Sequence, residues 1–353
     1  MSELRGAIIG YGLAGSVFHG PLIESTPGLA VAVVATGDPE RADRARHAHP
    51  GAEVVATPEE ALARAAELDF AVVATANERH VPLAGHALDA GLPAVVEKPL
   101  APSAAEARPL VERAGELGLP LTVFMNRRWD SDQLTLRSLL AADRLGRVLR
   151  HESRFERWRP RLAPGEVWRE SSPPKAGGGV LLDLGSHLVD QALGLLGPVR
   201  QVYAEIDHRR AGPADDDAFL ALHHESGALS HLWCSSLAAV PGPRLRVLGD
   251  RAGFVVTDVD GQEQALRSGE RPGPGAGWGM EPRERWGKLV DEDGSEAIES
   301  RPGAWPEFYA GWELTLREGN PPPVDPSEAV AGLEILDAAR RSASDGSVVS
   351  LAR

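Results

Sequence analysis

Short apolar runs alternate with helical segments through the first third of the chain. The runs lie at residues 7–9, 30–35, 70–74, 94–96 and 121–125. Side chains that suit helix N-termini lie between them, at Asp38, Thr57 and Ser103. Because parallel strands need a long return connection, this alternation predicts a parallel sheet with crossover helices. We therefore expect an α/β fold in residues 1–125, a doubly wound Rossmann domain.

The pattern changes after residue 125. Longer runs, many of which alternate apolar and polar side chains, lie at residues 148–155, 199–207, 218–224, 228–234, 245–248 and 253–258. Such alternation is typical of an antiparallel sheet with one covered face. Residues 160–179 and 267–282 are rich in proline or glycine and predict loops, whereas residues 325–342 predict a capped final helix. The expectation is an α+β domain with an open, mostly antiparallel sheet in residues 126–353, and 353 residues suit two domains.

A glycine-rich turn follows the first apolar run, with the sequence Gly10-Tyr11-Gly12-Leu13-Ala14-Gly15. In such a turn the first glycine allows a tight bend, the second lets the backbone approach a pyrophosphate, and the third allows close helix packing. The following helix supplies N–H groups and the positive end of its dipole. The position after the first strand favours a dinucleotide site over a structural turn. The expected cofactor contacts are Gly10, Tyr11, Gly12, Leu13 and Ala14.

The end of the second apolar run bears on the choice of nicotinamide cofactor. An acidic side chain there binds the ribose 2′-hydroxyl, but the run ends in Ala35-Thr36-Gly37. Arg41 and Arg44 follow within reach of a 2′-phosphate. The pattern favours NADP over NAD, with Thr36 and Arg41 as contacts. The alternative is that Asp38 only caps its helix and that both arginines are solvated.

A lysine ends the fourth long apolar run, in Glu97-Lys98-Pro99. Ligands bind at the carboxyl ends of parallel strands, so Lys98 is expected at the reacting centre. An ammonium group there stabilises an oxygen that becomes negative as a hydroxyl loses its proton. A surface lysine in a loop is the alternative, which the following proline makes less favoured.

A second chemical cluster lies in residues 177–190, where three glycines precede a predicted helix. Asp183, His187 and Asp190 are spaced to share one face of that helix. Histidine titrates near neutral pH, so His187 can remove a proton from a hydroxyl, and Asp183 can orient the imidazole or hold a neighbouring hydroxyl. The alternative is a solvated polar face, but the glycines favour close approach to a bulky group.

Other candidates are weaker, and each has a structural alternative. Thr75, Asn77 and His80 follow a strand and either contact the nicotinamide ribose or begin a helix. Trp168 and Arg169 suit the wall of a sugar-sized pocket, or the tryptophan is simply half-buried. His223, His224 and His231 have no metal-ligand spacing and are expected to be structural, so no metal site is predicted. Cys234 is expected to be a buried thiol.

Charge and composition restrict the class of partner. The net charge of −14 argues against nucleic acid and anionic membranes, which need a basic surface. A single cysteine excludes an intrachain disulfide and suggests a reducing compartment. The sequence has no apolar run near the length of a membrane span. The expectation is a cytoplasmic protein with a small-molecule partner.

In combination, the glycine turn, Glu97-Lys98-Pro99 and residues 177–190 resemble the glucose-fructose oxidoreductase/inositol dehydrogenase/rhizopine-catabolism (Gfo/Idh/MocA) family over nearly the whole chain. Residues 11–23 and 126–132 are similar to its NADP-dependent scyllo-inositol dehydrogenase branch, which directs attention to Arg128 as a substrate contact. The resemblance implies a homodimer and catalytic positions for Lys98, Asp183 and His187. It also implies cofactor contacts at Thr75, Asn77, His80, Glu97, Lys98, Trp168 and Arg169. Two departures are Ala76, where a proline often stands, and the loop at residues 269–282.

The sequence therefore predicts reversible hydride transfer between NADP(H) and a secondary hydroxyl of a cyclic polyol or sugar. Lys98 would polarise the reacting oxygen, His187 would act as general acid and base, and Asp183 would bind or orient. One alternative is a non-catalytic regulator that binds the dinucleotide; retention of the lysine and histidine disfavours it. Another is an enzyme that oxidises its substrate transiently, as a redox-neutral glycosidase or epimerase.

Overall fold

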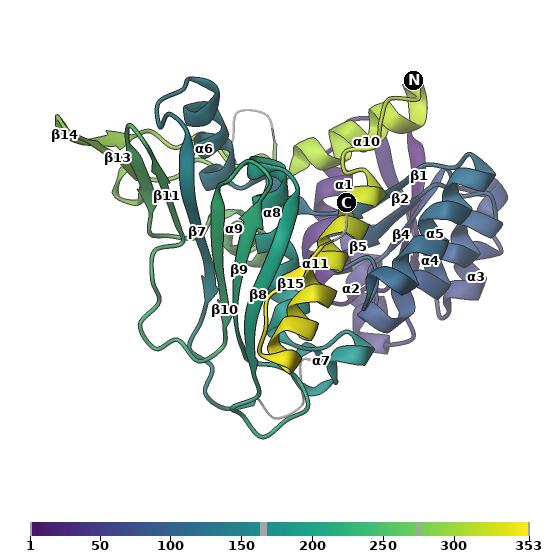
Figure 1. The fold of residues 1–353 in the computed structure, drawn as a ribbon. Coiled ribbons are helices and arrows are strands. Elements are labelled where there is room, and N and C mark those ends of the chain that lie inside the picture. The colour runs from purple at the N-terminus through teal and green to yellow at the C-terminus, as the bar shows by residue number, and fades with distance from the viewer. Residues whose placement is uncertain (1, 163–167, 274–276, 352–353) are drawn as a thin grey trace.

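Two β-sheets form the two sides of the molecule (Figure 1). The computed structural model describes residues 2–162, 168–273 and 277–351. The first sheet has six parallel strands in the order β3-β2-β1-β4-β5-β6, the strand order of a doubly wound dinucleotide-binding domain. Its strands are β1 (Leu4–Ile9), β2 (Leu29–Ala35), β3 (Glu53–Val55), β4 (Phe70–Val73), β5 (Ala94–Glu97) and β6 (Leu121–Phe124). The predicted Rossmann fold is confirmed.

Helices connect these strands as the capping residues predict. They are α1 (Gly20–Glu24), α2 (Pro39–Ala48), α3 (Pro58–Leu62), α4 (His80–Asp89) and α5 (Ala104–Leu117). Asp38, Thr57 and Ser103 each accept a hydrogen bond from a backbone N–H in the first turn of the following helix. Strand β3 is absent from the prediction because it has only three residues, and the first of them is an exposed glutamate.

The second sheet has nine strands within the described ranges, in the order β14-β13-β12-β11-β7-β10-β9-β8-β15. Strands β7 and β10 pair in parallel and the other pairs are antiparallel. The bounds are β7 (Val148–Glu156), β8 (Val199–Asp207), β9 (Asp217–His224), β10 (Leu229–Ser235), β11 (Leu245–Gly249), β12 (Gly253–Val256), β13 (Gly287–Asp291), β14 (Gly294–Ile298) and β15 (Val349–Ser350). The mostly antiparallel sheet is confirmed. The sequence does not reveal β13, β14 and β15, because the hairpin is largely exposed and β15 has two residues.

The helices of the second half are α6 (Ser131–Ala141), α7 (Trp168–Ser171), α8 (Ser186–Leu196), α9 (Gln262–Arg267), α10 (Pro306–Glu318) and α11 (Pro326–Asp345). Helix α11 matches the predicted final helix. Helix α7 interrupts the first predicted loop, and α9 extends to the start of the second. Residues 163–167 and 274–276, which belong to those two predicted loops, lie outside the described residues.

The end of the chain returns to the first sheet. Helix α11 packs on β8 and on α5, so it lies between the two halves (Figure 1). The ring of Trp312 on α10 meets the edge of Phe70, and Thr122 donates a hydrogen bond to the carbonyl of Val324 at 2.8 Å. One buried apolar core therefore extends through both sheets. A boundary between independent domains near residue 125 stays a prediction.

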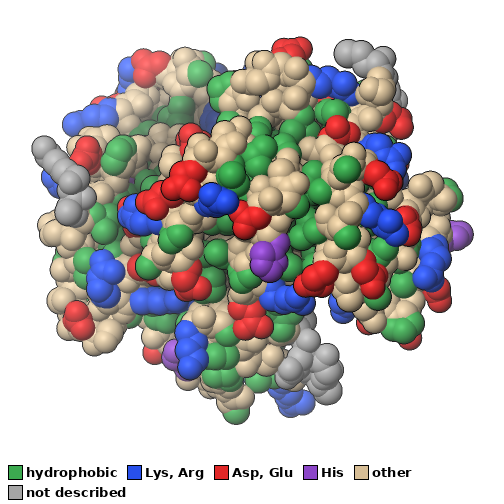
Figure 2. Space-filling view, turned by 90° about the vertical axis from the view of Figure 1, so that its right-hand side faces the viewer, with side chains coloured by type: hydrophobic (Ala, Val, Ile, Leu, Met, Phe, Trp, Pro, Cys, Tyr) green, Lys and Arg blue, Asp and Glu red, His purple; other side chains and the backbone are tan. Residues whose placement is uncertain are grey.

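Acidic and basic side chains are interspersed over the face of the molecule that Figure 2 shows. That mixture agrees with a chain of 51 acidic and 37 basic residues. Within the described ranges, none of the helices combines the length and apolar character needed to cross a membrane.

Candidate active site

A groove of about 770 Å³ follows the carboxyl ends of the first strands, beside the glycine turn. Gly10 has φ +99°, and a Cβ there would lie 2.6 Å from the carbonyl oxygen of Ala74. A Cβ on Gly15 would collide with the carbonyl oxygen of Gly10, whereas one on Gly12 would make only an ordinary contact, at 3.8 Å from the Arg41 guanidinium. The first and third glycines thus permit the turn and its packing, and the second leaves the backbone accessible. The turn fits the pyrophosphate of a dinucleotide.

The end of β2 supplies the far wall of this groove. Thr36, Asp38 and Arg41 all line it, as does Arg79, which the sequence analysis missed. One oxygen of Asp38 accepts the backbone N–H of Arg41, and the other lies 3.6 Å from Nε of the same arginine. Asp38 is therefore both a helix cap and a partner of Arg41. This pair keeps Arg41 beside the groove.

A second cavity, of about 310 Å³, adjoins the groove. It is lined by the three predicted catalytic residues, Lys98, Asp183 and His187. Leu13, Ala14 and Arg169 line both spaces, so the cavity and the groove are neighbours. The other described lining residues of the smaller cavity are Phe18, Glu97, Asn126, Arg127, Arg157, Arg159, Leu184, Glu263, Arg267 and Trp305. A small molecule in this cavity lies beside whatever occupies the inner end of the groove.

Lys98 and Asp183 form an ion pair across this cavity. The Lys98 ammonium lies 3.0 Å from Oδ1 of Asp183 and donates to its carbonyl oxygen at 2.7 Å. The same carboxylate lies 3.3 Å from Arg169 and 3.7 Å from Arg157. Burial alone would raise the pKa of Asp183, but these three cations lower it, so the carboxylate is ionised. Asp183 therefore binds Lys98, whereas the sequence predicts that its carboxylate can orient the imidazole of His187.

The glycines before Asp183 are explained by the chain itself. Gly177 and Gly179 have positive φ values. A Cβ on Gly177 would collide with Asn77, and one on Gly179 would collide with the carboxylate of Asp215. Asp215 accepts the backbone N–H of Leu181 at 2.7 Å. The glycines therefore allow close packing against protein side chains, and they fix the start of the turn that carries Asp183.

His187 lies in the first turn of α8 and lines the same cavity. Its ring is 5% exposed and lies edge-on to Phe155, with 6.2 Å between the ring centroids. Burial and then the charges of Lys98 and Arg127 lower the pKa of His187 well below its usual value. The imidazole is neutral at neutral pH, which suits it to accept a proton.

Glu97 connects the lysine strand to a buried polar chain. Its carboxylate accepts the backbone N–H of Lys98 at 3.0 Å and lies 3.1 Å from Nε2 of His19. The other ring nitrogen of His19 lies 2.6 Å from the hydroxyl of Tyr309 on α10. Burial favours the protonated acid, yet the hydrogen bond from His19 and the charge of Lys98 lower the pKa of Glu97. The sequence analysis missed His19 and Tyr309, which come from distant segments.

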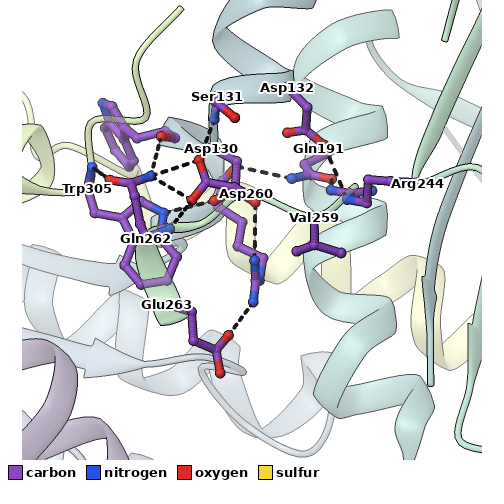
Figure 3. Close-up of polar contacts among 12 residues, drawn as sticks. Asp130, Ser131, Asp132, Gln191, Arg244, Val259, Asp260, Gln262, Glu263 and Trp305 are labelled. Carbon is purple, nitrogen blue, oxygen red and sulfur yellow. Dashed lines mark hydrogen bonds and ion pairs between the residues drawn. The ribbon is translucent and has the colours of Figure 1, made fainter. Parts of the chain in front are cut away.

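Arg127 lines the cavity and pairs with two acidic side chains, Asp130 and Glu263. Figure 3 shows both carboxylates together with Trp305. The guanidinium of Arg127 lies 3.2 Å from Asp130 and 2.6 Å from Glu263, and it stacks over Phe155 at 4.7 Å. Trp305, also in the cavity wall, donates its indole N–H to Asp130 at 2.8 Å. Burial raises the pKa of Asp130 well above its usual value, and neighbouring carboxylates add to the shift.

Arg128, expected to contact the substrate, is paired with two carboxylates, and its substrate contact stays a prediction. Its guanidinium binds Asp190 at 2.5 and 2.9 Å and Glu328 at 2.6 Å, and it does not line the cavity. Asp190, expected on the same face as Asp183 and His187, is occupied by this pair. The reason is local geometry. A π-helical turn at Leu181–Gly185 precedes α8, which breaks the regular spacing from Asp183 to Asp190.

Asn77 and His80, two predicted cofactor contacts, bind the backbone of segments that border the site. Asn77 is buried and donates to the carbonyl of Gly177 at 2.7 Å. His80 is fully buried, with ring nitrogens 2.8 and 3.2 Å from the carbonyl oxygens of Pro99 and Thr75. Neither lines the groove, because both side chains turn inward to hold neighbouring backbone. Thr75 and Trp168 do line it, and Arg169 stacks over the Trp168 ring at 4.5 Å.

Comparison with known protein families agrees with this geometry. Residues 4–125 match the oxidoreductase family with an NAD-binding Rossmann fold, and residues 133–255 match the GFO/IDH/MocA C-terminal domain. The chain belongs to the Gfo/Idh/MocA family of oxidoreductases, and residues 4–125 match its NAD(P)-binding Rossmann domain.

The relatives cover the chain from end to end. It is 36% identical over 354 residues to the uncharacterised oxidoreductase YdgJ of Escherichia coli, with 99% of each chain covered. It is 32% identical over 355 residues to the scyllo-inositol 2-dehydrogenase (NADP(+)) IolW of Bacillus subtilis, covering 99% of this chain and 97% of the relative. The solved structure of the yvaA protein of Bacillus subtilis superposes with a TM-score of 0.93 at 32% identity, with 99% of both chains covered.

Proposed function

We propose that the protein transfers a hydride reversibly between NADP(H) and a secondary hydroxyl or keto group of a polyol or sugar. The observation that carries this proposal is that the two spaces adjoin through shared lining residues. Lys98 and His187 line a small cavity that shares Leu13, Ala14 and Arg169 with the groove beside the glycine turn. A dinucleotide laid along the groove brings its reactive ring to that junction.

The nicotinamide, when bound, supplies the hydride acceptor or donor. Lys98 donates a hydrogen bond to the reacting oxygen, where its charge stabilises the negative charge that develops. His187, neutral and buried, takes the hydroxyl proton during oxidation and returns it during reduction. Asp183 holds the ammonium of Lys98 at 3.0 Å, so it positions the lysine. Phe18, Leu184 and Trp305 supply the apolar part of the wall that excludes water.

Two kinds of support favour NADP and a polyhydroxylated substrate. The end of β2 presents Thr36 and Arg41 to the groove, and Asp38 is engaged with Arg41. A relative that the chain matches over almost its full length is named as an NADP-dependent scyllo-inositol 2-dehydrogenase. A cytoplasmic location and a homodimer belong to the same proposal.

The test is a screen of inositols, aldoses and their keto forms as substrates. Each is mixed with NADP⁺, NADPH, NAD⁺ or NADH, and the absorbance of the reduced nicotinamide measures the reaction. Consumption of cofactor with at least one polyol or sugar is expected, and it would exclude the regulator. Product formation without cofactor consumption would instead indicate an enzyme that oxidises its substrate transiently, as a redox-neutral glycosidase or epimerase does. Cofactor binding without reaction of any probe would favour the alternative of a non-catalytic regulator that binds the dinucleotide.

A further inference from the structure

Cationic side chains outnumber carboxylates in the 310 Å³ cavity, although the whole chain has a net charge of −14. Among the described residues that line it, six are lysine or arginine and three are aspartate or glutamate. Those three carboxylates are already engaged. Glu97 lies against His19, Glu263 is shared by Arg127 and Arg267, and Asp183 is shared by Lys98 and two arginines.

The surplus is concentrated where β7 runs into the cavity. Arg157 and Arg159 alternate along an extended segment, so their side chains share one face. Both guanidinium groups form ion pairs with the carboxylate of Glu170, at nitrogen–oxygen distances of 3.4 Å for Arg157 and 3.1 Å for Arg159. Arg210 occupies that same carboxylate at 2.7 Å, so three guanidinium groups share Glu170.

Among the described residues, the polar partners of the Arg157 side chain all lie at long range, and one of them is the hydroxyl of Ser236 at 3.4 Å. The contacts of Arg157 with carboxylates are long, at 3.4 Å to Glu170 and 3.7 Å to Asp183. Burial lowers the pKa of Arg157, and the charges of Arg159 and Arg210 act in the same direction. A partly buried guanidinium is stabilised by a close, bidentate anion, and the described residues give it none at short range.

We propose that the substrate carries an anionic group, a carboxylate or a phosphate, which Arg157 and Arg159 bind while its carbinol carbon lies against Lys98 and His187. This inference rests on the proposed function and narrows its substrate class. Arg157 and Lys98 share Asp183 as a neighbour, so the anionic group and the reacting carbon belong to one small molecule. In oxidation the carbinol C–H bond gives its hydride to the nicotinamide, and the O–H proton passes to His187. The anionic group is unchanged.

The pyrophosphate of the cofactor does not account for these arginines. Arg169 lines both the groove and the cavity, whereas Arg157 and Arg159 line the cavity alone. The glycine turn that fits the pyrophosphate lies in the groove. Substitution of Arg159 is therefore expected to weaken substrate and to leave cofactor affinity unchanged.

The experiment compares matched probes that differ in one group. Isothermal titration of the protein saturated with NADP⁺ measures D-glucose against D-glucuronate, and D-glucose against D-glucose 6-phosphate. The charged member of at least one pair is expected to bind about tenfold or more tightly, as one charge-assisted contact implies. The pair with the larger ratio distinguishes a carboxylate from a phosphate. Equal or undetectable binding of charged and neutral members would overturn the inference.

Variants locate the effect. Arg159→Gln is expected to reduce the preference for the charged probe about tenfold, and Arg159→Lys to restore part of it. Arg144→Gln removes an equal charge from a surface pair with Glu296 and is the control. A preference that survives in Arg159→Gln, or a large loss of NADP⁺ affinity there, would contradict the assignment. Charged probes that bind but are not oxidised would refute the proposed dehydrogenase and leave the anion site standing. Oxidation of neutral polyols without any preference for a charged probe would refute the anion site and leave the proposed dehydrogenase standing.

Discussion

The ammonium of Lys98 is held by two oxygens of one residue, the carboxylate of Asp183 at 3.0 Å and its backbone carbonyl at 2.7 Å. Lys98 is the first residue after β5, and Asp183 lies in the turn before α8. The pair therefore joins the Rossmann sheet to the second half of the chain at the reaction cavity. The lysine reaches its position through Asp183, so the two residues are expected to act as a unit.

Lys98→Met keeps a side chain of similar length and removes its charge. Turnover is expected to fall by about 10² to 10³-fold, the effect of losing one donor to a developing oxyanion. NADP⁺ affinity, measured by fluorescence titration, is expected to stay within about twofold. Asp183→Asn is expected to reduce turnover less, and the double variant should be no slower than Lys98→Met alone. Additive losses in the double variant would show that the two residues act separately.

The pH dependence of oxidation is expected to report His187. Because its pKa lies well below the usual 6.5, the neutral imidazole that accepts the proton persists through mildly acidic pH. kcat/KM for oxidation at saturating NADP⁺ should therefore stay level down to pH 6.5 and decline only below it. His187→Gln should lower the rate by about 10² to 10⁴-fold and remove that decline. An acidic decline centred above pH 6.5 would contradict the assignment.

Cofactor selection is expected to depend on Arg41 at the end of the groove. Arg41→Gln removes a charge that faces a 2′-phosphate, so the ratio of kcat/KM for NADP⁺ to that for NAD⁺ should fall by about tenfold or more. The NAD⁺ value itself should change little. Arg113→Gln, on the surface of α5, is a control with the same change of charge. An unchanged ratio in Arg41→Gln would show that the arginine is only a solvated partner of Asp38.

Much of the fold could be predicted because long buried strands leave a strong local signal. Strands β1, β2, β4, β5 and β6 each contain a mainly apolar, buried run, and capping side chains mark the helices between them. The short or exposed strands β3, β13, β14 and β15 leave almost none. The first sheet was therefore predicted nearly complete, and the edges of the second were not.

The site divides in the same way. Lys98 was predictable from its position at a strand end, and His187 from its place behind a glycine-rich turn. The choice between Arg127 and Arg128 was not, because both lie in one short 3₁₀ turn, where a single step along the chain rotates the side chain by about 120°. Glu263, Arg267 and Trp305 reach the cavity from distant segments with no local motif. Arg157 and Arg159 did carry a signal, an alternating pair of arginines at the end of a strand.

The two adjacent arginines are expected to respond differently to substitution. Arg128→Gln breaks a largely buried pair with Asp190, so it should lower the free energy of unfolding by about 2 to 4 kcal/mol and leave KM for substrate unchanged. Arg127→Gln should raise KM or lower kcat. Urea denaturation and steady-state kinetics on the same preparations separate the outcomes. A raised KM in Arg128→Gln with normal stability would restore the arginine to the binding site.

Acid stability is expected to depend on His151, which is buried against Ser230. Burial and the nearby charges of Arg244 and His224 lower the pKa of His151 to about 3. Between pH 6.5 and 3 the unfolded chain binds a proton that the native protein does not. The free energy of unfolding therefore falls with decreasing pH in that window, by about 1.4 kcal/mol per pH unit for one fully shifted group.

His151→Gln is expected to lose about 1.5 to 2 kcal/mol less stability than the wild type between pH 7 and pH 5. Urea denaturation at the two pH values measures the difference. His47→Gln, at an exposed position on α2, should retain the wild-type dependence. A wild-type dependence in His151→Gln would show that this histidine does not contribute to it.

The most direct test of the reaction follows one atom. A polyol or sugar acid oxidised in the screen is prepared with deuterium on its carbinol carbon and incubated with NADP⁺, and the reduced cofactor is examined by NMR. Direct hydride transfer predicts deuterium at C4 of the nicotinamide, on one face, at a rate that falls at least about 10²-fold in Lys98→Met. Reduced cofactor without deuterium, or labelled cofactor formed equally fast by Lys98→Met, would contradict a reaction centred on this cavity.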